Sequence, residues 1–268
     1  MPKVLSVFRG SRSERRFQRG IYLLPSMFTV GNMFCGWACV VYAIRGDYAT
    51  AAPLVAFAMV LDSLDGRIAR FTGATSDFGV EFDSLADVIS FGVAPAILVF
   101  SWGLASLGRL GWAVGFLYIT AAAMRLARFN IQQTGEDKRY FIGLPSPAAA
   151  GVIASTVFAY PSGLDRIPEA LFTLPVMGIP AALMVSRIKF RSFNALIPTR
   201  RHSYLTLLLI AGAVAVVTVH PQGVLVLMAY SYMLSGPAGL VVARVRRRHH
   251  GTKTADVDAT ASENRSVS

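Results

Sequence analysis

Residues 62–87 read D-S-L-D-G-R-I-A-R-F-T-G-A-T-S-D-F-G-V-E-F-D-S-L-A-D. Four aspartates of this run fall where the flanking sequence predicts the ends of membrane helices: Asp62, Asp65, Asp83 and Asp87. Ionised groups at such a depth cost free energy and usually mark a functional site. Six of the fifteen acidic residues of the chain lie in this run, so we expect the chemistry of the protein here.

Long apolar runs on both sides of these aspartates predict a polytopic membrane protein. The chain of 268 residues is 54% hydrophobic and only 15% charged, whereas a soluble domain carries about 25% charged residues. Apolar runs of roughly 17–25 residues are long enough to cross a bilayer as helices. The predicted fold class is therefore all-α, a helical bundle with about eight transmembrane helices. The eight runs cover residues 21–44, 48–70, 83–107, 110–130, 146–164, 168–187, 203–219 and 223–244.

The basic residues predict how this bundle is oriented. With eight spans and a cytoplasmic N-terminus, the outer loops hold only Arg45, Arg109 and Arg166, and the other 23 of the 26 Lys and Arg residues lie on or near the cytoplasmic side. This is the distribution that the positive-inside rule requires. We therefore expect a multi-pass protein of the cell (inner or plasma) membrane, with both termini and the aspartates facing the cytoplasm. The basic groups at 187–201 and 244–248 favour anionic membrane lipids as partners, and no nucleic-acid partner is expected.

A single membrane domain is the simplest organisation. Residues 1–20 are predicted to be a cytoplasmic basic arm, and residues 21–244 the transmembrane domain. Residues 245–268 are predicted to be a disordered cytoplasmic tail, because the segment from Gly251 is polar and almost free of large apolar side chains. The basic N-terminal stretch and the long apolar run after it predict no cleavable signal peptide.

The spacing of the four aspartates predicts a shared carboxylate site. Asp62 and Asp65 are three residues apart, and Asp83 and Asp87 are four apart, so each pair shares a helix face. A short loop between antiparallel helices brings the two faces together. Converging carboxylates repel one another unless a cation neutralises them, and ligation by oxygen alone suits Mg²⁺ or Mn²⁺. The alternative, a solvated cluster of charges at helix ends, does not explain two such pairs with glycines between them.

Small residues around the carboxylates leave room for a bulky ligand. Arg70 lies one helical turn beyond Gly66 and is placed to pair with a phosphate. Hard divalent ions commonly keep ligand positions open for substrate phosphates, so a ligand that carries phosphate groups fits this setting. The small residues are Gly66, Ala69, Gly73 and Gly79.

The pattern D-x2-D-G-x2-A-R-x8-G-x3-D-x3-D is matched without a gap from Asp62 to Asp87, and it resembles the signature of the CDP-alcohol phosphotransferase family. The resemblance implies an integral membrane enzyme that displaces CMP from a CDP-linked lipid with an alcohol. It implies that the four aspartates bind divalent metal ions and that Asp87 is also the general base for the acceptor hydroxyl. The segment S-M-F-T, Ser26 to Thr29, resembles a nucleotide-contacting segment of the family. The resemblance assigns CDP binding to Ser26, Thr29, Asp62, Asp65, Gly66, Ala69, Arg70, Ser76 and Gly79.

Two later segments bear on the acceptor. R-L-A-R-F-N at residues 125–130 and G-L-P-S-P-A-A-A-G at residues 143–151 resemble the family members that use serine. The resemblance implies CDP-diacylglycerol and L-serine as substrates and a homodimer as the assembly. The candidate residues for binding the acceptor are Arg125, Arg128, Asn130 and Ser146.

Alternatives remain open for the acceptor and for the class of protein. Arginine can hold a carboxylate or a phosphate, so glycerol 3-phosphate or an inositol phosphate is an alternative acceptor. Arg125 and Arg128 can also be explained as ordinary anchors at the cytoplasmic ends of helices. A cation-coupled transporter is a remote alternative, but it would be expected to carry inverted repeats and broken helices near the bilayer midplane.

Overall fold

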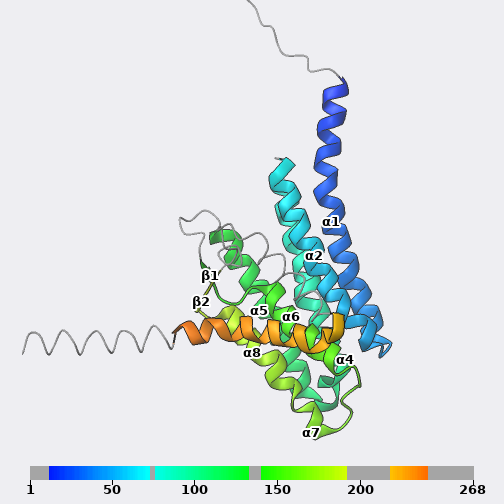
Figure 1. The fold of residues 1–268 in the computed structure, drawn as a ribbon, viewed down its shortest axis with the longest axis vertical. Helices are drawn as coiled ribbons and strands as arrows, with labels where there is room; N and C mark the ends of the chain where they lie inside the picture. The colour runs from blue at the N-terminus through cyan, green and yellow to red at the C-terminus, as the bar shows by residue number, and fades with distance from the viewer. Residues whose placement is uncertain (1–11, 73–75, 133–139, 192–217, 241–268) are drawn as a thin grey trace, which may run out of the picture.

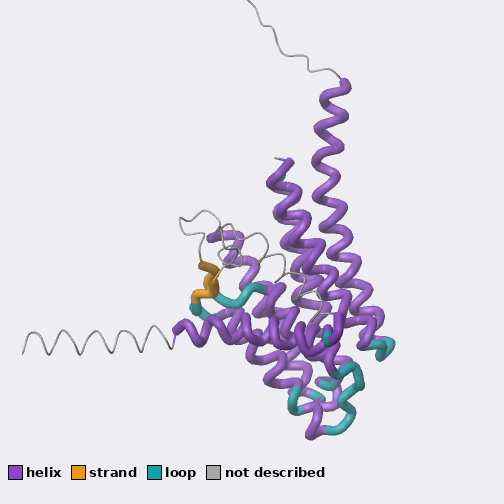
Figure 2. Tube along the Cα trace, viewed as in Figure 1, coloured by secondary structure: helices purple, strands orange, loops and turns teal. Residues whose placement is uncertain are grey.

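Helices form nearly all of the part of the chain that the structure describes. The computed structural model describes residues 12–72, 76–132, 140–191 and 218–240 (Figure 1). Figure 2 shows the helices as a bundle, with two short strands at one edge. This confirms the all-α fold class, to which the structure adds one small strand pair.

The elements follow one another in a simple order. The α-helices are α1 (Arg12–Ile44), α2 (Tyr48–Thr72), α3 (Asp77–Asp87), α4 (Ala94–Trp102), α5 (Arg109–Gln132), α6 (Ser146–Ala159), α7 (Ile167–Ala170) and α8 (Thr173–Val185). The π-helix η1 (Val88–Val93) joins α3 to α4, and the 3-10 helix η2 (Leu104–Leu107) follows α4. The strands are β1 (Tyr140–Ile142) and β2 (Lys189–Arg191). A last helix, Pro221–Leu240, is called the C-terminal helix below.

Six helical stretches are long and apolar enough to cross a membrane, which identifies a multi-pass membrane protein. They are Ser26–Ile44, Tyr48–Ile68, Asp77–Trp102, Arg109–Ile131, Ile167–Val185 and Pro221–Leu240.

Two of the eight expected spans are not among these six. The fifth is α6, which has only 14 residues and is about 21 Å long, shorter than the roughly 30 Å hydrocarbon core of a bilayer. The helix ends at Ala159. Pro161 lies two residues further on, and proline disrupts the interior of a helix. The seventh, residues 203–219, lies outside the described residues apart from its last two, so a count of eight stays a prediction.

The first span begins before the predicted boundary. α1 starts at Arg12, so residues 12–20 of the predicted arm continue this span as one helix. In Figure 1 its N-terminal end extends past the neighbouring α2. The rest of the arm, residues 1–11, and the predicted tail lie outside the described residues.

The centre of the bundle forms where α1 packs along α2. α1 also contacts α3, η1 and α4, while α5 contacts η1 and α8. Fully buried small side chains on α1 and α2 let the two backbones approach closely, as is common in membrane helices. They include Cys39, Ala43, Ala51, Ala52 and Ala58.

The strand pair joins the loops that follow α5 and α8. β1 pairs with β2 in antiparallel register, and the Gly143 backbone N–H donates to the Ile188 carbonyl at 2.8 Å. Gly143 has a φ of +83°, and a Cβ there would clash with the Met184 carbonyl oxygen. The buried Phe190 ring occupies the space where Gly236 of the C-terminal helix lacks a side chain. These contacts gather the ends of α5 and α8 and the C-terminal helix at one side of the molecule.

Candidate active site

The aspartates stand at the junction of α2 and α3. Asp62 and Asp65 lie in the last turns of α2, and Asp83 and Asp87 lie on α3. The Ser76 hydroxyl begins α3 by accepting a hydrogen bond from the Gly79 N–H at 3.0 Å, as an N-cap residue does. A Cβ at Gly79 would lie 3.1 Å from that hydroxyl and would crowd the cap.

Carboxylate oxygens of Asp62, Asp83 and Asp87 lie within 4.8 Å of one another, and all three residues are half-buried. The fourth, Asp65, is buried beside them and interacts electrostatically with Asp62 and Asp83. The structure therefore brings the two aspartate pairs together, as their spacing along the two helices predicts.

Asp65 is held by the first helix. The Thr29 hydroxyl on α1 donates to the Asp65 Oδ2 atom at 3.0 Å, and both side chains are 4% exposed. Hydrogen bonds to an ionised group are stronger than those between neutral groups. This bond fixes the direction in which Asp65 presents its other oxygen.

The carboxylate cluster fits a divalent cation. The buried Asp83 Oδ1 atom has no hydrogen-bond partner among the residues that the structure describes. A buried acceptor without a donor costs about 1–3 kcal/mol, and the neighbouring carboxylates repel it. A hard divalent ion would satisfy this oxygen and offset the repulsion, and such ions take carboxylate ligands.

Asp87 has a partner that sequence reasoning missed. Asn32 on α1 is fully buried, and its Nδ2 donates to the Asp87 Oδ1 atom at 3.4 Å. Asp87 is also the residue at which α3 gives way to η1, and single turns of π-helix are frequent at functional sites. The sequence does contain an indication that Asn32 belongs to the site. Asn32 is a polar amide within an apolar span, and it lies three residues after Thr29, on the same helix face.

Arg125 is a cation beside the carboxylates. Its side chain is 9% exposed, and its Nη1 donates to the Ser146 hydroxyl at 2.9 Å. The guanidinium lies over the Phe129 ring, 5.2 Å from the centroid, and interacts electrostatically with Asp87 and Asp62. A buried charge needs such partners. Arg125 and Ser146, both candidates for binding the acceptor, thus meet next to the aspartates.

The other two acceptor candidates have structural partners. Arg128 Nη1 donates to the Val185 carbonyl at the end of α8, at 3.2 Å. Asn130 Nδ2 donates to the Ser84 hydroxyl on α3, at 2.9 Å. Both bonds tie the end of α5 to a neighbouring helix, so each side chain has a packing role whether or not it also binds a ligand.

The remaining residues assigned to CDP are only partly described. Ser26 is half-buried on α1, and Gly66 lies on α2 between the aspartates and the end of the helix. Ala69 and Arg70 belong to the last turn of α2, but their side chains lie outside the described part of the structure, as does Gly73.

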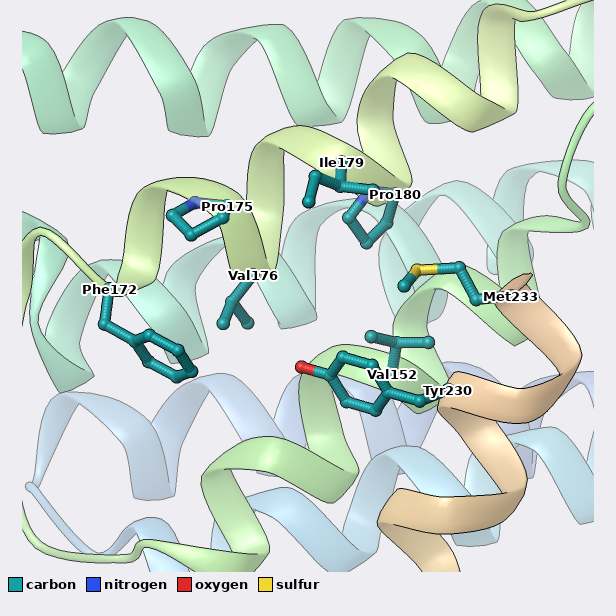
Figure 3. A pocket seen from close by; sticks show the side chains of 8 residues that line it. All are labelled: Val152, Phe172, Pro175, Val176, Ile179, Pro180, Tyr230 and Met233. Atoms are coloured by element: carbon teal, nitrogen blue, oxygen red, sulfur yellow. The ribbon is translucent and has the colours of Figure 1, made fainter. Parts of the chain in front are cut away.

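An apolar pocket of about 110 Å³ lies apart from the carboxylates, between α6, α8 and the C-terminal helix. Figure 3 shows Val152, Phe172, Tyr230 and Met233 among the side chains around it. The Tyr230 hydroxyl shares a hydrogen bond of 2.9 Å with the Thr156 hydroxyl. None of the described residues that line this pocket is charged, so we assign the chemistry to the carboxylate site.

Comparison with known proteins gives a family and several relatives. Residues 22–186 match the sequence profile of the CDP-alcohol phosphatidyltransferase family. A CDP-diacylglycerol–serine O-phosphatidyltransferase of Helicobacter pylori (strain ATCC 700392 / 26695) is 42% identical over 176 residues, 65% of this chain and 74% of the relative. The protein of the same name in Mycobacterium leprae (strain TN) is 30% identical over 233 residues, 85% of this chain and 77% of the relative. An archaetidylserine synthase of Methanothermobacter thermautotrophicus is 38% identical over 169 residues, 62% of this chain and 69% of the relative.

Proposed function

The chain belongs to the CDP-alcohol phosphatidyltransferase family, and we propose that it transfers the phosphatidyl group of CDP-diacylglycerol to the hydroxyl of L-serine, giving phosphatidylserine and CMP. The observation that carries the activity is the approach of the Asp62, Asp83 and Asp87 oxygens to within 4.8 Å of one another. The relatives support the acceptor, because their names specify serine. Membership of this family leaves the transporter alternative without support.

The four aspartates are the proposed metal ligands. Mg²⁺ or Mn²⁺ bound there would neutralise the diphosphate and stabilise CMP as a leaving group. Thr29 orients Asp65 for this task through its hydroxyl. The proposed contacts of the CDP group are the residues that flank these carboxylates: Ser26, Thr29, Gly66, Ala69, Arg70, Ser76 and Gly79.

Asp87 is the proposed general base. It takes the proton of the serine hydroxyl while the hydroxyl oxygen forms a bond to the phosphorus of the phosphatidyl group. The bond from that phosphorus to the CMP oxygen breaks, and CMP leaves with the electron pair. The reaction is a direct displacement, so no nucleophilic side chain is required.

Arg125 is the proposed partner of the serine carboxylate. Its guanidinium lies close enough to Asp87 and Asp62 to interact with them, and charge-assisted bonds from arginine to carboxylate are strong and directional. Ser146, bonded to Arg125 at 2.9 Å, keeps the guanidinium in place. Arg128 and Asn130 support this side of the site by tying α5 to α8 and α3.

An acceptor panel tests the proposal. Purified protein with CDP-diacylglycerol and Mg²⁺ or Mn²⁺ is given L-serine, glycerol 3-phosphate or an inositol phosphate, and CMP release is measured. We expect release with serine. Release with another acceptor but none with serine would overturn the acceptor while leaving the family chemistry intact.

Asp87→Asn is the matched variant for this panel. It keeps the size of the side chain but removes the base, so we expect kcat with serine to fall by at least about 100-fold, the lower end of what general-base catalysis contributes. Turnover by this variant at the wild-type rate would show that Asp87 is not the base.

The proposal includes an active site on the cytoplasmic side and a homodimer. The placement of Lys and Arg supports the first, and the family resemblance supports the second. Cross-linking in membranes, followed by separation under denaturing conditions, tests the dimer.

A further inference from the structure

The side-chain amide of Asn32 has one atom that forms a hydrogen bond and one that, among the described residues, does not, and the proposed reaction involves only the first. Its Nδ2 donates to Asp87 Oδ1, while its Oδ1 atom is buried and has no hydrogen-bond partner within the described part of the chain. The assignment of the two atoms follows from chemistry, because a carboxylate accepts hydrogen bonds and only the amide nitrogen can donate one. Burial of a carbonyl oxygen without a donor is unfavourable, so a donor from a ligand would stabilise the site.

The packing of α1 against η1 holds Asn32 in this position. The Ser90 hydroxyl on η1 donates to the Asn32 backbone carbonyl at 3.0 Å. One turn further along α1, Gly36 permits the contact, since a Cβ there would lie 2.7 Å from Ser90 Oγ and 2.9 Å from Ser90 Cα. The backbone of α1 at Asn32 is therefore held against η1, the segment that directly follows Asp87.

The free acceptor lies close to the proposed base. The oxygen and nitrogen of one amide are about 2.2 Å apart because they share a carbon. With Nδ2 at 3.4 Å from Asp87 Oδ1, the Asn32 Oδ1 atom lies no more than about 5.6 Å from that carboxylate oxygen. One small molecule can thus contact both atoms at once.

We propose that Asn32 Oδ1 binds the ammonium group of the acceptor, so that an amino alcohol with its two groups on adjacent carbons is held with its hydroxyl at Asp87 and its ammonium at Asn32. The inference rests on the proposed function and names the part of the site that recognises the serine amine. The surrounding carboxylates favour a cationic donor over a neutral one. Arg125 supplies the complementary charge for the carboxylate of the same molecule.

The first experiment uses the wild-type protein alone. CMP release is measured with L-serine and with 3-hydroxypropanoate, which keeps the hydroxyl and carboxylate of serine but lacks the amine. We expect kcat/KM for 3-hydroxypropanoate to be lower by about 10- to 100-fold, the range expected for one hydrogen bond to a charged group. Equal use of the two acceptors would overturn the inference without any variant.

The second experiment compares Asn32→Ala with Asn32→Asp. The alanine variant lacks the acceptor oxygen, so we expect the preference for serine over 3-hydroxypropanoate to fall towards unity, with a raised KM for serine. The aspartate variant keeps an oxygen for the ammonium but loses the donor to Asp87, so it should retain the preference while kcat falls. An unchanged preference in Asn32→Ala would overturn the inference.

Two further readouts separate this role from a structural one. Affinity for CDP at a saturating concentration of Mn²⁺ should stay within about two-fold of wild type in both variants, because the nucleotide does not contact the amide in this arrangement and excess metal offsets any weaker binding of Mn²⁺ at Asp87. Ser155→Ala is the control, since its buried hydroxyl donates to the Val152 carbonyl of its own helix, and it should keep the wild-type preference. Loss of CDP binding in Asn32→Ala, with equal losses for both acceptors, would identify a folding defect and overturn the inference. Failure of wild type to use serine at all would instead overturn the proposed function.

Discussion

At the scale of single residues, Asp65 depends on a hydroxyl from another helix. The Thr29 side chain donates to it at 3.0 Å in a buried setting. Asp65 is one of the proposed metal ligands, and removal of a group that orients a metal ligand typically changes metal affinity by about 10- to 100-fold. Thr29 therefore orients a carboxylate of the site, in addition to lying in the segment that resembles a CDP-contacting segment.

We predict that Thr29→Val weakens metal binding by about 10-fold or more, because valine keeps the shape of threonine but cannot donate a hydrogen bond. The Mn²⁺ concentration needed for half-maximal CMP release measures this. Thr29→Ser, which keeps the hydroxyl, is the control and should stay near wild type. The same Mn²⁺ dependence in Thr29→Val and wild type would show that the bond contributes nothing to the metal site.

The sequence predicts the convergence of the aspartates but not their supporting residues. Spacings of three and four place Asp62 with Asp65 and Asp83 with Asp87, and a short loop then brings the pairs together. The role of Asn32 depends instead on the distance between α1 and η1, which comes from packing between segments 55 residues apart in sequence. For the same reason, the bond from Asn130 to Ser84 could not be foreseen from residues 125–130 alone.

At the scale of elements, the site depends on how closely α1 approaches η1. Gly36 is buried against Ser90, and this contact lies one turn from Asn32. Because an added side chain at Gly36 would push the two helices apart, the distance between Asn32 and Asp87 would change as well. The distance between two helices thus controls a contact of the proposed base.

We predict that Gly36→Ala destabilises the protein by about 1–3 kcal/mol, the usual cost of overpacking a core, and also lowers kcat. Thermal unfolding in detergent and CMP release measure the two effects. The control is Gly178→Ala on α8, where a Cβ would meet no described atom within 4 Å; alanine there should stabilise the helix by about 0.5–1 kcal/mol. Equal stability of Gly36→Ala and wild type would show that α1 can adjust without strain.

The apolar runs predict the elements well where the helices are long and regular. They do not reveal η1, because a π-helical turn follows from local packing rather than from the period of apolar residues. They also overestimate α6, because the predicted run extends to residue 164 whereas the helix ends at Ala159, just before Tyr160 and Pro161. The sequence does not predict β1 and β2, because each strand has only three residues and the two pair only when the loops after α5 and α8 meet.

At the scale of the whole molecule, the residues of the site come from helices far apart in the sequence. Thr29 and Asn32 lie on α1, Asp62 and Asp65 on α2, Asp83 and Asp87 on α3, and Arg125 on α5. The site can therefore form only in the assembled bundle. The charges outside the spans then decide which side of the membrane it faces, because basic loops stay in the cytoplasm.

Two exposed positions at opposite ends of the bundle test this orientation. Asp77 begins α3 beside the aspartate site, and Arg166 precedes α7 in a predicted outer loop. In a background with Cys35 and Cys39 changed to Ala, we predict that a membrane-impermeant maleimide labels Arg166→Cys in intact cells and labels Asp77→Cys only after permeabilisation. Retained CMP release shows that each variant is folded. Labelling of Asp77→Cys in intact cells would place the site outside, where the positive-inside rule forbids it and where a cytoplasmic pool of serine could not reach it.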